Sequence, residues 1–103
     1  MSIKMSDEQI GVNHTTVFVE GELDIFTIET LIEKIDRLSV TRCNVNLDGV
    51  TFIDSSGIGL LIRKVMDWKE EGRILTISDM QPVVYEVMEE MGAFIILEEV
   101  YSQ

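Results

Sequence analysis

Residues 54–59 read Asp-Ser-Ser-Gly-Ile-Gly, and they stand where an apolar segment gives way to an amphipathic one. The first turn of a helix offers unpaired backbone N–H groups and the positive end of the helix dipole, which suits a phosphate. Ser55 and Ser56 therefore admit two interpretations, a plain helix cap or a phosphorylation switch. As the expected N-cap, Ser55 would have its oxygen engaged by backbone N–H groups. We therefore predict Ser56 as the phosphate acceptor, with Ser55 as its competitor.

Carboxylates accompany these serines. Asp54 opens the motif, and residues 21–24 (Gly-Glu-Leu-Asp) follow another predicted strand in a corresponding way. If the two strands are parallel neighbours, both turns lie at the same edge of the sheet, where open α/β sheets bind ligands and partners. The sequence thus predicts a partner-binding surface made of Glu22, Asp24, Asp54, Ser55, Ser56 and Gly57.

The case for an enzyme is poor, and no catalytic residue is predicted. A nucleophile elbow needs Gly-x-Ser-x-Gly, but the required glycines around Ser55 and Ser56 are replaced at positions 53, 54 and 58. The only histidine, His14, falls in an expected surface turn at 13–15. A small serine hydrolase that pairs His14 with Ser56 remains the remote alternative.

Metal and nucleotide sites are equally unsupported. The chain has one histidine and one cysteine, without a ligand-spaced cluster. Gly57 and Gly59 begin a dinucleotide fingerprint, but its third glycine would be residue 62, which is isoleucine. A Gly-Lys-Ser/Thr phosphate loop is also missing. We therefore expect neither a cofactor nor a metal.

Periodicity predicts the elements that position the motif. Apolar residues at helical spacing favour helices over 27–39, with Thr27 as N-cap, from 58 to Gly72, and from Pro82 to Gly92. Strands are expected at 17–20, 43–47, 50–53, 74–77 and 94–97, with an earlier strand near Ile3 and a turn at Asp48-Gly49. This alternation predicts one α/β domain over residues 1–103. Its sheet should be mixed, mostly parallel and four- to five-stranded, with crossover helices and an N-terminal edge or antiparallel strand.

Three other residue types bear on the core. Met66, Met88 and Met91 fall at helical spacing and are expected inside. Trp68 lies beside the apolar stripe of its helix, which leaves a half-buried core residue and an exposed partner anchor both open. Cys43 is the only cysteine, so no disulfide within the chain is expected, as in a reducing compartment.

The charge balance narrows the class of partner. The formal net charge is −11, from 19 acidic and 8 basic residues. Nucleic acid and anionic membranes are disfavoured because both require clustered Lys and Arg. A basic patch on another protein is a natural partner, although the acidity could serve solubility alone. Without a signal peptide or a membrane-length apolar run, we expect a cytoplasmic protein.

Together these motifs resemble the STAS-domain anti-sigma factor antagonists of bacteria. The resemblance rests on residues 21–24 and on residues 50–59 (Val-Thr-Phe-Ile-Asp-Ser-Ser-Gly-Ile-Gly), about 30 residues apart, and extends over nearly the whole chain. It is supported by the later Gly72, Pro82 and Met91-Gly92. Family members usually end in a further helix after the last strand, and with a strand at 94–97 this sequence would depart from that pattern.

The resemblance implies a binding module without catalysis. An unmodified antagonist binds an anti-sigma factor that is also a serine kinase, and binding releases the sigma factor. The kinase uses ATP and magnesium to phosphorylate the second serine of the motif, here Ser56, and a serine phosphatase resets the switch. By position, Asp24 matches a residue at the kinase-facing edge. An unmodified STAS scaffold or regulatory subunit is the alternative, and either would be a monomer or a weak dimer.

Overall fold

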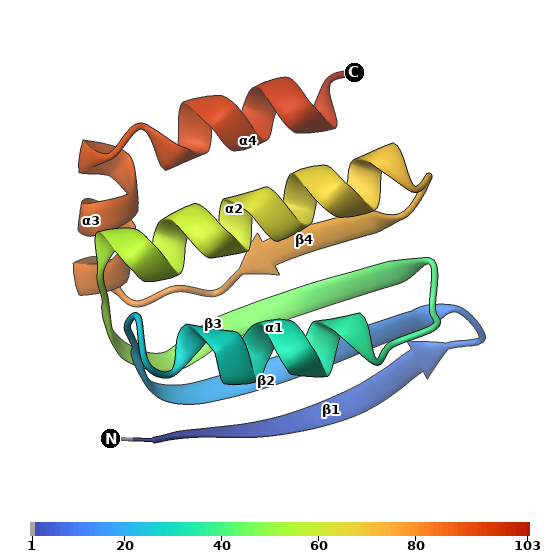
Figure 1. The fold of residues 1–103 in the computed structure, drawn as a ribbon, viewed down its shortest axis with the longest axis horizontal. Helices are drawn as coiled ribbons and strands as arrows, with labels where there is room; N and C mark the ends of the chain where they lie inside the picture. The colour runs from blue at the N-terminus through green and yellow to red at the C-terminus, as the bar shows by residue number, and fades with distance from the viewer. Residues whose placement is uncertain (1) are drawn as a thin grey trace.

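The computed structural model describes residues 2–103, which form four β-strands and four α-helices. In chain order the elements are β1 (Ile3–Gly11), β2 (His14–Leu23), α1 (Ile28–Asp36), β3 (Arg42–Ile53), α2 (Ser55–Glu70), β4 (Ile74–Ser78), α3 (Pro82–Glu90) and α4 (Ala93–Tyr101) (Figure 1). No helix in this described part of the chain combines the length and the apolar character needed to cross a bilayer.

The sheet has the strand order β1-β2-β3-β4. β1 and β2 form an antiparallel hairpin, whereas β2 and β4 each run parallel to β3 and connect to it through α1 and α2. This confirms the predicted mixed, mostly parallel α/β sheet with crossover helices. The predicted hairpin turn at 13–15 was wrong. Two residues suffice to reverse an antiparallel pair, so Val12 and Asn13 make the turn and His14 already pairs with Gly11.

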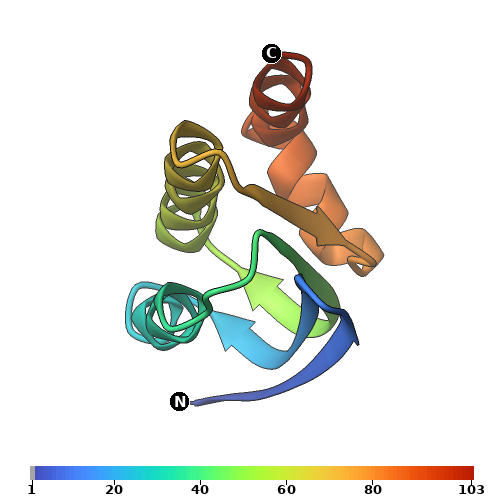
Figure 2. The same cartoon turned by 90° about the vertical axis from the view of Figure 1, so that its right-hand side faces the viewer.

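The two faces of the sheet differ in chemistry. α1 and α2 lie on one face, and α4 packs beside α2 and α3 (Figure 2). Along β3, alternate side chains Cys43, Val45 and Leu47 are fully buried, as the two-residue period of a strand requires. On the opposite face the amide of Asn44 donates a hydrogen bond to the Ser78 hydroxyl, 2.9 Å away. The apolar core therefore lies between the sheet and its helices.

The central helices follow the predicted periodicity. α1 buries Ile28, Leu31 and Ile35, which recur at helical spacing, although it is shorter than the predicted 27–39. α2 ends at Glu70, and Gly72 follows with a φ of +76°, a left-handed conformation that glycine adopts without a Cβ penalty.

The predicted turn at Asp48-Gly49 was wrong, because β3 continues through both residues. The pairing of β2 with β3 instead shifts register between Phe18 and Glu20, opposite this point. A Cβ added to Gly49 would lie 2.9 Å from the Val19 carbonyl oxygen and 2.6 Å from Glu20 Cγ. Glycine therefore permits an irregularity inside a strand here.

The predicted strand at 94–97 was also wrong, because these residues belong to α4. A short apolar run cannot separate a strand from a buried helix by periodicity alone. Gly92 takes a φ of +72°, ends α3 and turns the chain into α4. α4 buries Ala93, Leu97 and Val100, a helical spacing. The expected departure from the family is therefore wrong as well, since a final helix is present.

The large side chains of α2 and α3 divide between core and surface. Trp68, left open by the sequence, is a core residue with 1% of its surface exposed. Met88 is buried as predicted, whereas Met66 and Met91 are exposed, contrary to the prediction. Met66 lies beside, and not within, the buried stripe of α2, which includes Ile62, Val65 and Trp68.

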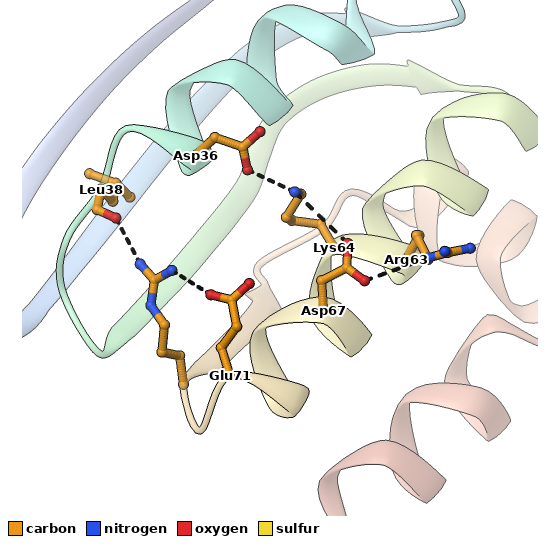
Figure 3. Close-up of polar contacts among 7 residues, drawn as sticks. Asp36, Leu38, Arg63, Lys64, Asp67 and Glu71 are labelled. Carbon is orange, nitrogen blue, oxygen red and sulfur yellow. Dashed lines mark hydrogen bonds and ion pairs between the residues drawn. The ribbon is translucent and has the colours of Figure 1, made fainter.

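Polar contacts join the helices and the following strand on the side shown in Figure 3. Lys64 of α2 lies 2.7 Å from the carboxylate of Asp36 at the end of α1. Arg73, just before β4, donates to the carbonyl oxygens of Leu38 (2.7 Å) and Val40 (3.0 Å). Its guanidinium also lies 3.7 Å from the centre of the Trp68 ring. Arg73 thus ties the α1–β3 connection to the end of α2.

Candidate functional site

The predicted site residues come together where β2 and β3 end. Leu23 and Ile53, the last residues of these parallel strands, are paired in register. The backbone N–H of Asp54 then donates to the carbonyl oxygen of Leu23 at 3.1 Å. The loops that follow the two strands therefore lie side by side at one end of the sheet (Figure 1). The prediction that both turns share one edge is confirmed.

The loop after β2 is organised by Asp24. Its carboxylate accepts hydrogen bonds from the backbone N–H groups of Phe26 (2.9 Å) and Thr27 (3.0 Å). The Thr27 hydroxyl donates to the Glu22 carbonyl oxygen at 2.6 Å and accepts the Asp24 N–H at 2.9 Å. Thr27 does precede α1, but its side chain does not cap the helix as predicted. The hydroxyl instead closes the loop that precedes the helix, through its bonds to the main chain of Glu22 and Asp24.

The loop after β3 is capped by Asp54. Its carboxylate accepts the backbone N–H of Gly57 at 2.8 Å, and α2 begins with Ser55. The prediction that Ser55 is the N-cap was therefore wrong, because the residue before it supplies the capping oxygen. Gly57 is buried, and a Cβ there would lie 3.1 Å from the Leu23 carbonyl oxygen. Glycine lets the two loops approach this closely.

The two serines occupy the first turn of α2. Ser55 is exposed and Ser56 is half-buried. Neither hydroxyl has a hydrogen-bond partner among residues 2–103, since Asp54 serves as the cap. The first-turn N–H groups and the helix dipole favour a negative group at either serine. Ser55 does not cap the helix, so a capping role no longer favours Ser56 over Ser55 as the phosphate acceptor.

Exposed apolar side chains border the serines, and the sequence analysis did not include them. Phe26 is 85% exposed and Ile25 is 57% exposed, both in the loop that Asp24 organises. Leu60, on the second turn of α2, is also exposed. The available signal was two large apolar residues directly after Gly-Glu-Leu-Asp, in a segment too short to bury them. An apolar centre beside polar groups is typical of a protein-binding surface.

The pKa of Asp24 is lowered from its ordinary value of 3.8. Desolvation of the carboxyl group raises the pKa, but the hydrogen bonds from the Thr27 and Phe26 backbone N–H groups outweigh it. Asp24 is therefore a carboxylate throughout the neutral range, and its negative charge helps to hold the loop beside Ser56.

This shift predicts a pH dependence of stability. A carboxyl with a lowered folded-state pKa stabilises the fold fully above its unfolded pKa, and this contribution is lost as pH falls through the folded value. We expect wild type to exceed Asp24→Asn in free energy of unfolding at neutral pH, with the difference shrinking on acidification below about 3.8. Urea unfolding across this range, with a carboxyl-carbon NMR titration of Asp24, checks it. A constant difference, or a titration at or above 3.8, would contradict it.

The structure separates Ser56 from His14. His14 begins β2, whereas Ser56 follows the strand end that pairs with Leu23. Nine residues of strand, at about 3.3 Å each, put these ends about 30 Å apart, whereas a nucleophile and its base must be within about 3 Å. The serine hydrolase alternative therefore has no dyad. Within residues 2–103, no three His, Cys, Asp or Glu side chains form a group that could hold a metal ion.

Comparisons with known proteins agree with this arrangement. A family model described as "Mlab, STAS domain" matches residues 6–98. The anti-sigma-B factor antagonists of Listeria monocytogenes and Listeria innocua are each 22% identical over 101 residues, covering 95% of this chain and 89% of theirs. The solved structure of the anti-sigma factor antagonist SpoIIAA in its unphosphorylated form has a TM-score of 0.71 and 28% identity, covering 86% of this chain and 81% of that one. An anti-sigma factor antagonist from Mycobacterium paratuberculosis, with a TM-score of 0.71 and 21% identity over 88% of this chain and 79% of its own, shares the fold.

Proposed function

Because this chain belongs to the STAS domain family, we propose that it is an anti-sigma factor antagonist whose binding is switched off by phosphorylation of Ser56. The names of its Listeria relatives and of SpoIIAA support the general role. In this role the chain is a binding module and not an enzyme. Its unphosphorylated form binds an anti-sigma factor with serine kinase activity and thereby releases the sigma factor.

The observation that carries the proposal is the surroundings of Ser56. The residue lies in the first turn of α2, beside the loop that carries Asp24 and the exposed Phe26. A partner seated on this edge would contact the serine, the loop and the apolar side chains together. The preference for Ser56 over Ser55 rests on its place as the second serine of the family motif, since Ser55 is the more exposed of the two.

Phosphorylation would act at the interface and not on the fold. A phosphate adds about −1.5 to −2 charges and three acceptor oxygens. At a helix N-terminus the dipole favours such a group by roughly 0.3–1 kcal/mol, so the domain should stay folded. The partner, however, would meet a bulky dianion where it fitted a hydroxyl. Asp54 and Asp24, held in the two adjoining loops, would add further negative charge.

The partners follow from the same reasoning. The kinase surface that receives this edge should be basic around an apolar centre, because the chain has a formal net charge of −11 and presents Phe26 and Ile25 there. A serine phosphatase would restore the binding form. In this scheme ATP and magnesium are bound by the kinase.

The test is phosphorylation by the anti-sigma factor kinase of the same organism, with ATP and Mg²⁺, followed by intact mass and phosphosite mapping. We expect a gain of one phosphate, mapped to Ser56, abolished in Ser56→Ala and retained in Ser55→Ala as the matched control. A phosphate mapped to Ser55 would move the switch by one residue. A chain that binds the anti-sigma factor but never gains mass would contradict the switch and favour an unmodified STAS scaffold.

A further inference from the structure

A cavity lies away from the serine-bearing edge, between α2, β4 and α4, which are neighbours in Figure 2. Its volume is about 250 Å³, below the roughly 300–1,000 Å³ of pockets for drug-sized ligands. Its lining comes from these three elements and from Arg73, the residue before β4.

The lining is unusual for this chain because it contains no carboxylate. The protein has 19 acidic residues against 8 basic ones, yet both charged residues of the cavity are basic. The remaining walls are mainly apolar, from Val65, Leu75 and Val100. A ligand here must therefore be mostly apolar, and any charge that it carries should be negative.

Lys69 supplies a positive charge at the cavity. Its ammonium group donates to a main-chain oxygen of Gln103 at 2.6 Å, which leaves two of its three donors for a ligand. The Arg73 guanidinium, in contrast, already donates hydrogen bonds to Leu38, Val40 and Glu71, so fewer of its N–H groups are free for a ligand.

The edge of β4 supplies a second donor. The N–H of Ile74 donates to the Thr41 carbonyl oxygen at 2.9 Å, on the side of β3. Backbone groups alternate in direction along a parallel strand, so those of Leu75 point to the free edge. The Leu75 carbonyl accordingly accepts the Tyr101 hydroxyl at 2.7 Å. Its N–H lies on the same free edge, and Leu75 is one of the residues that line the cavity.

We propose that this cavity binds a small amphipathic carboxylate. The carboxylate would accept hydrogen bonds from the Lys69 ammonium group and the Leu75 N–H, a charge-assisted arrangement. The hydrocarbon part would lie against Val65, Ile74 and Val100. This binding is independent of the proposed phosphorylation switch, because none of its residues lies in the loops that carry the serines.

The protein contains its own reporter for this binding. Trp68 is the only tryptophan of the chain, and the Arg73 guanidinium lies 3.7 Å from its ring. Arg73 also lines the cavity. Because Arg73 lies between the cavity and the Trp68 ring, a ligand that fills the cavity should change the fluorescence of Trp68.

The experiment is a titration of the full chain with octanoate, below its micelle-forming concentration, followed by Trp68 fluorescence and backbone amide NMR. We expect a saturable fluorescence change and amide shifts centred on Leu75, Lys69 and Val100. Lys69→Met keeps the apolar stem and should weaken octanoate binding about tenfold or more. Lys34→Met, which removes a lysine of α1 outside the cavity, is the matched control and should bind as wild type.

Two further measurements test the role of the carboxylate and the role of the apolar cavity separately. Octanol should bind more weakly than octanoate and should be insensitive to Lys69→Met, whereas Val100→Phe should fill the cavity and abolish both. The proposal is overturned if octanoate causes no saturable change, if its shifts scatter over the surface, or if Lys69→Met and Lys34→Met behave alike. Binding of octanol with an affinity equal to that of octanoate would likewise overturn the assignment of a carboxylate.

Discussion

Replacing Ser56 with aspartate is expected to weaken binding to the anti-sigma factor several hundred-fold while the domain stays folded. The introduced carboxylate lies in the first turn of α2, where the helix dipole tolerates it. At the interface it meets a surface shaped for a hydroxyl, next to the carboxylates of Asp54 and Asp24. A loss of about 3–4 kcal/mol of binding free energy corresponds to this change in affinity.

The measurement is the dissociation constant of each variant for the anti-sigma factor, with thermal unfolding as the check on the fold. Ser39→Asp is the matched control, because Ser39 is an exposed serine in the α1–β3 connection and the substitution adds the same charge. It should bind within a few-fold of wild type. A Ser56→Asp protein that folds normally and binds the anti-sigma factor as tightly as wild type would contradict the proposed switch. Equal losses in both variants would point to net charge as the cause.

Trp68→Ala is expected to lower the free energy of unfolding by about 3–5 kcal/mol, the range for removal of a large aromatic side chain from a core. Trp68 is among the largest of the fully buried side chains, with 1% of its surface exposed. Its loss would leave a cavity in the core beside α2. It would also remove the ring over which the Arg73 guanidinium lies. Arg73 would then hold Leu38 and Val40 less firmly, so the α1–β3 connection should loosen as well.

Urea unfolding followed by far-UV circular dichroism measures this effect, because the variant lacks the only tryptophan. Phe26→Ala is the matched control, since it removes an aromatic side chain that is 85% exposed. Its stability should stay within about 0.5 kcal/mol of wild type, as for most surface substitutions. If Trp68→Ala were no more destabilised than Phe26→Ala, Trp68 could not be the core residue that the structure shows.

Sustained patterns in the sequence predicted their elements correctly, and short patterns did not. The stripe of α1 and the long stripe of α2 each repeat over several turns, so their period identifies a helix. Pro82 and Gly72 marked a helix start and a helix end, because their backbone restrictions act locally. Residues 94–97 offered only four apolar side chains, which fit a strand or a buried helix equally well. The Asp48-Gly49 pair predicted a turn because glycine is common both in turns and at irregularities within strands, and the local sequence does not distinguish the two.

The sequence by itself determined the helices α1, α2 and α3, the acidic composition, and the place of Ser55 and Ser56 at the start of a helix. These properties depend on local backbone preference, on side-chain period and on composition. The tertiary structure alone decided that Leu23 and Ile53 pair, so that the loops of Asp24 and Asp54 meet at one edge. It also decided that Asp54 caps α2, that Phe26 stays exposed and that residues 94–97 are helical. Each of these depends on contacts between residues that lie apart in the chain or on competition between neighbouring caps, which no local pattern records.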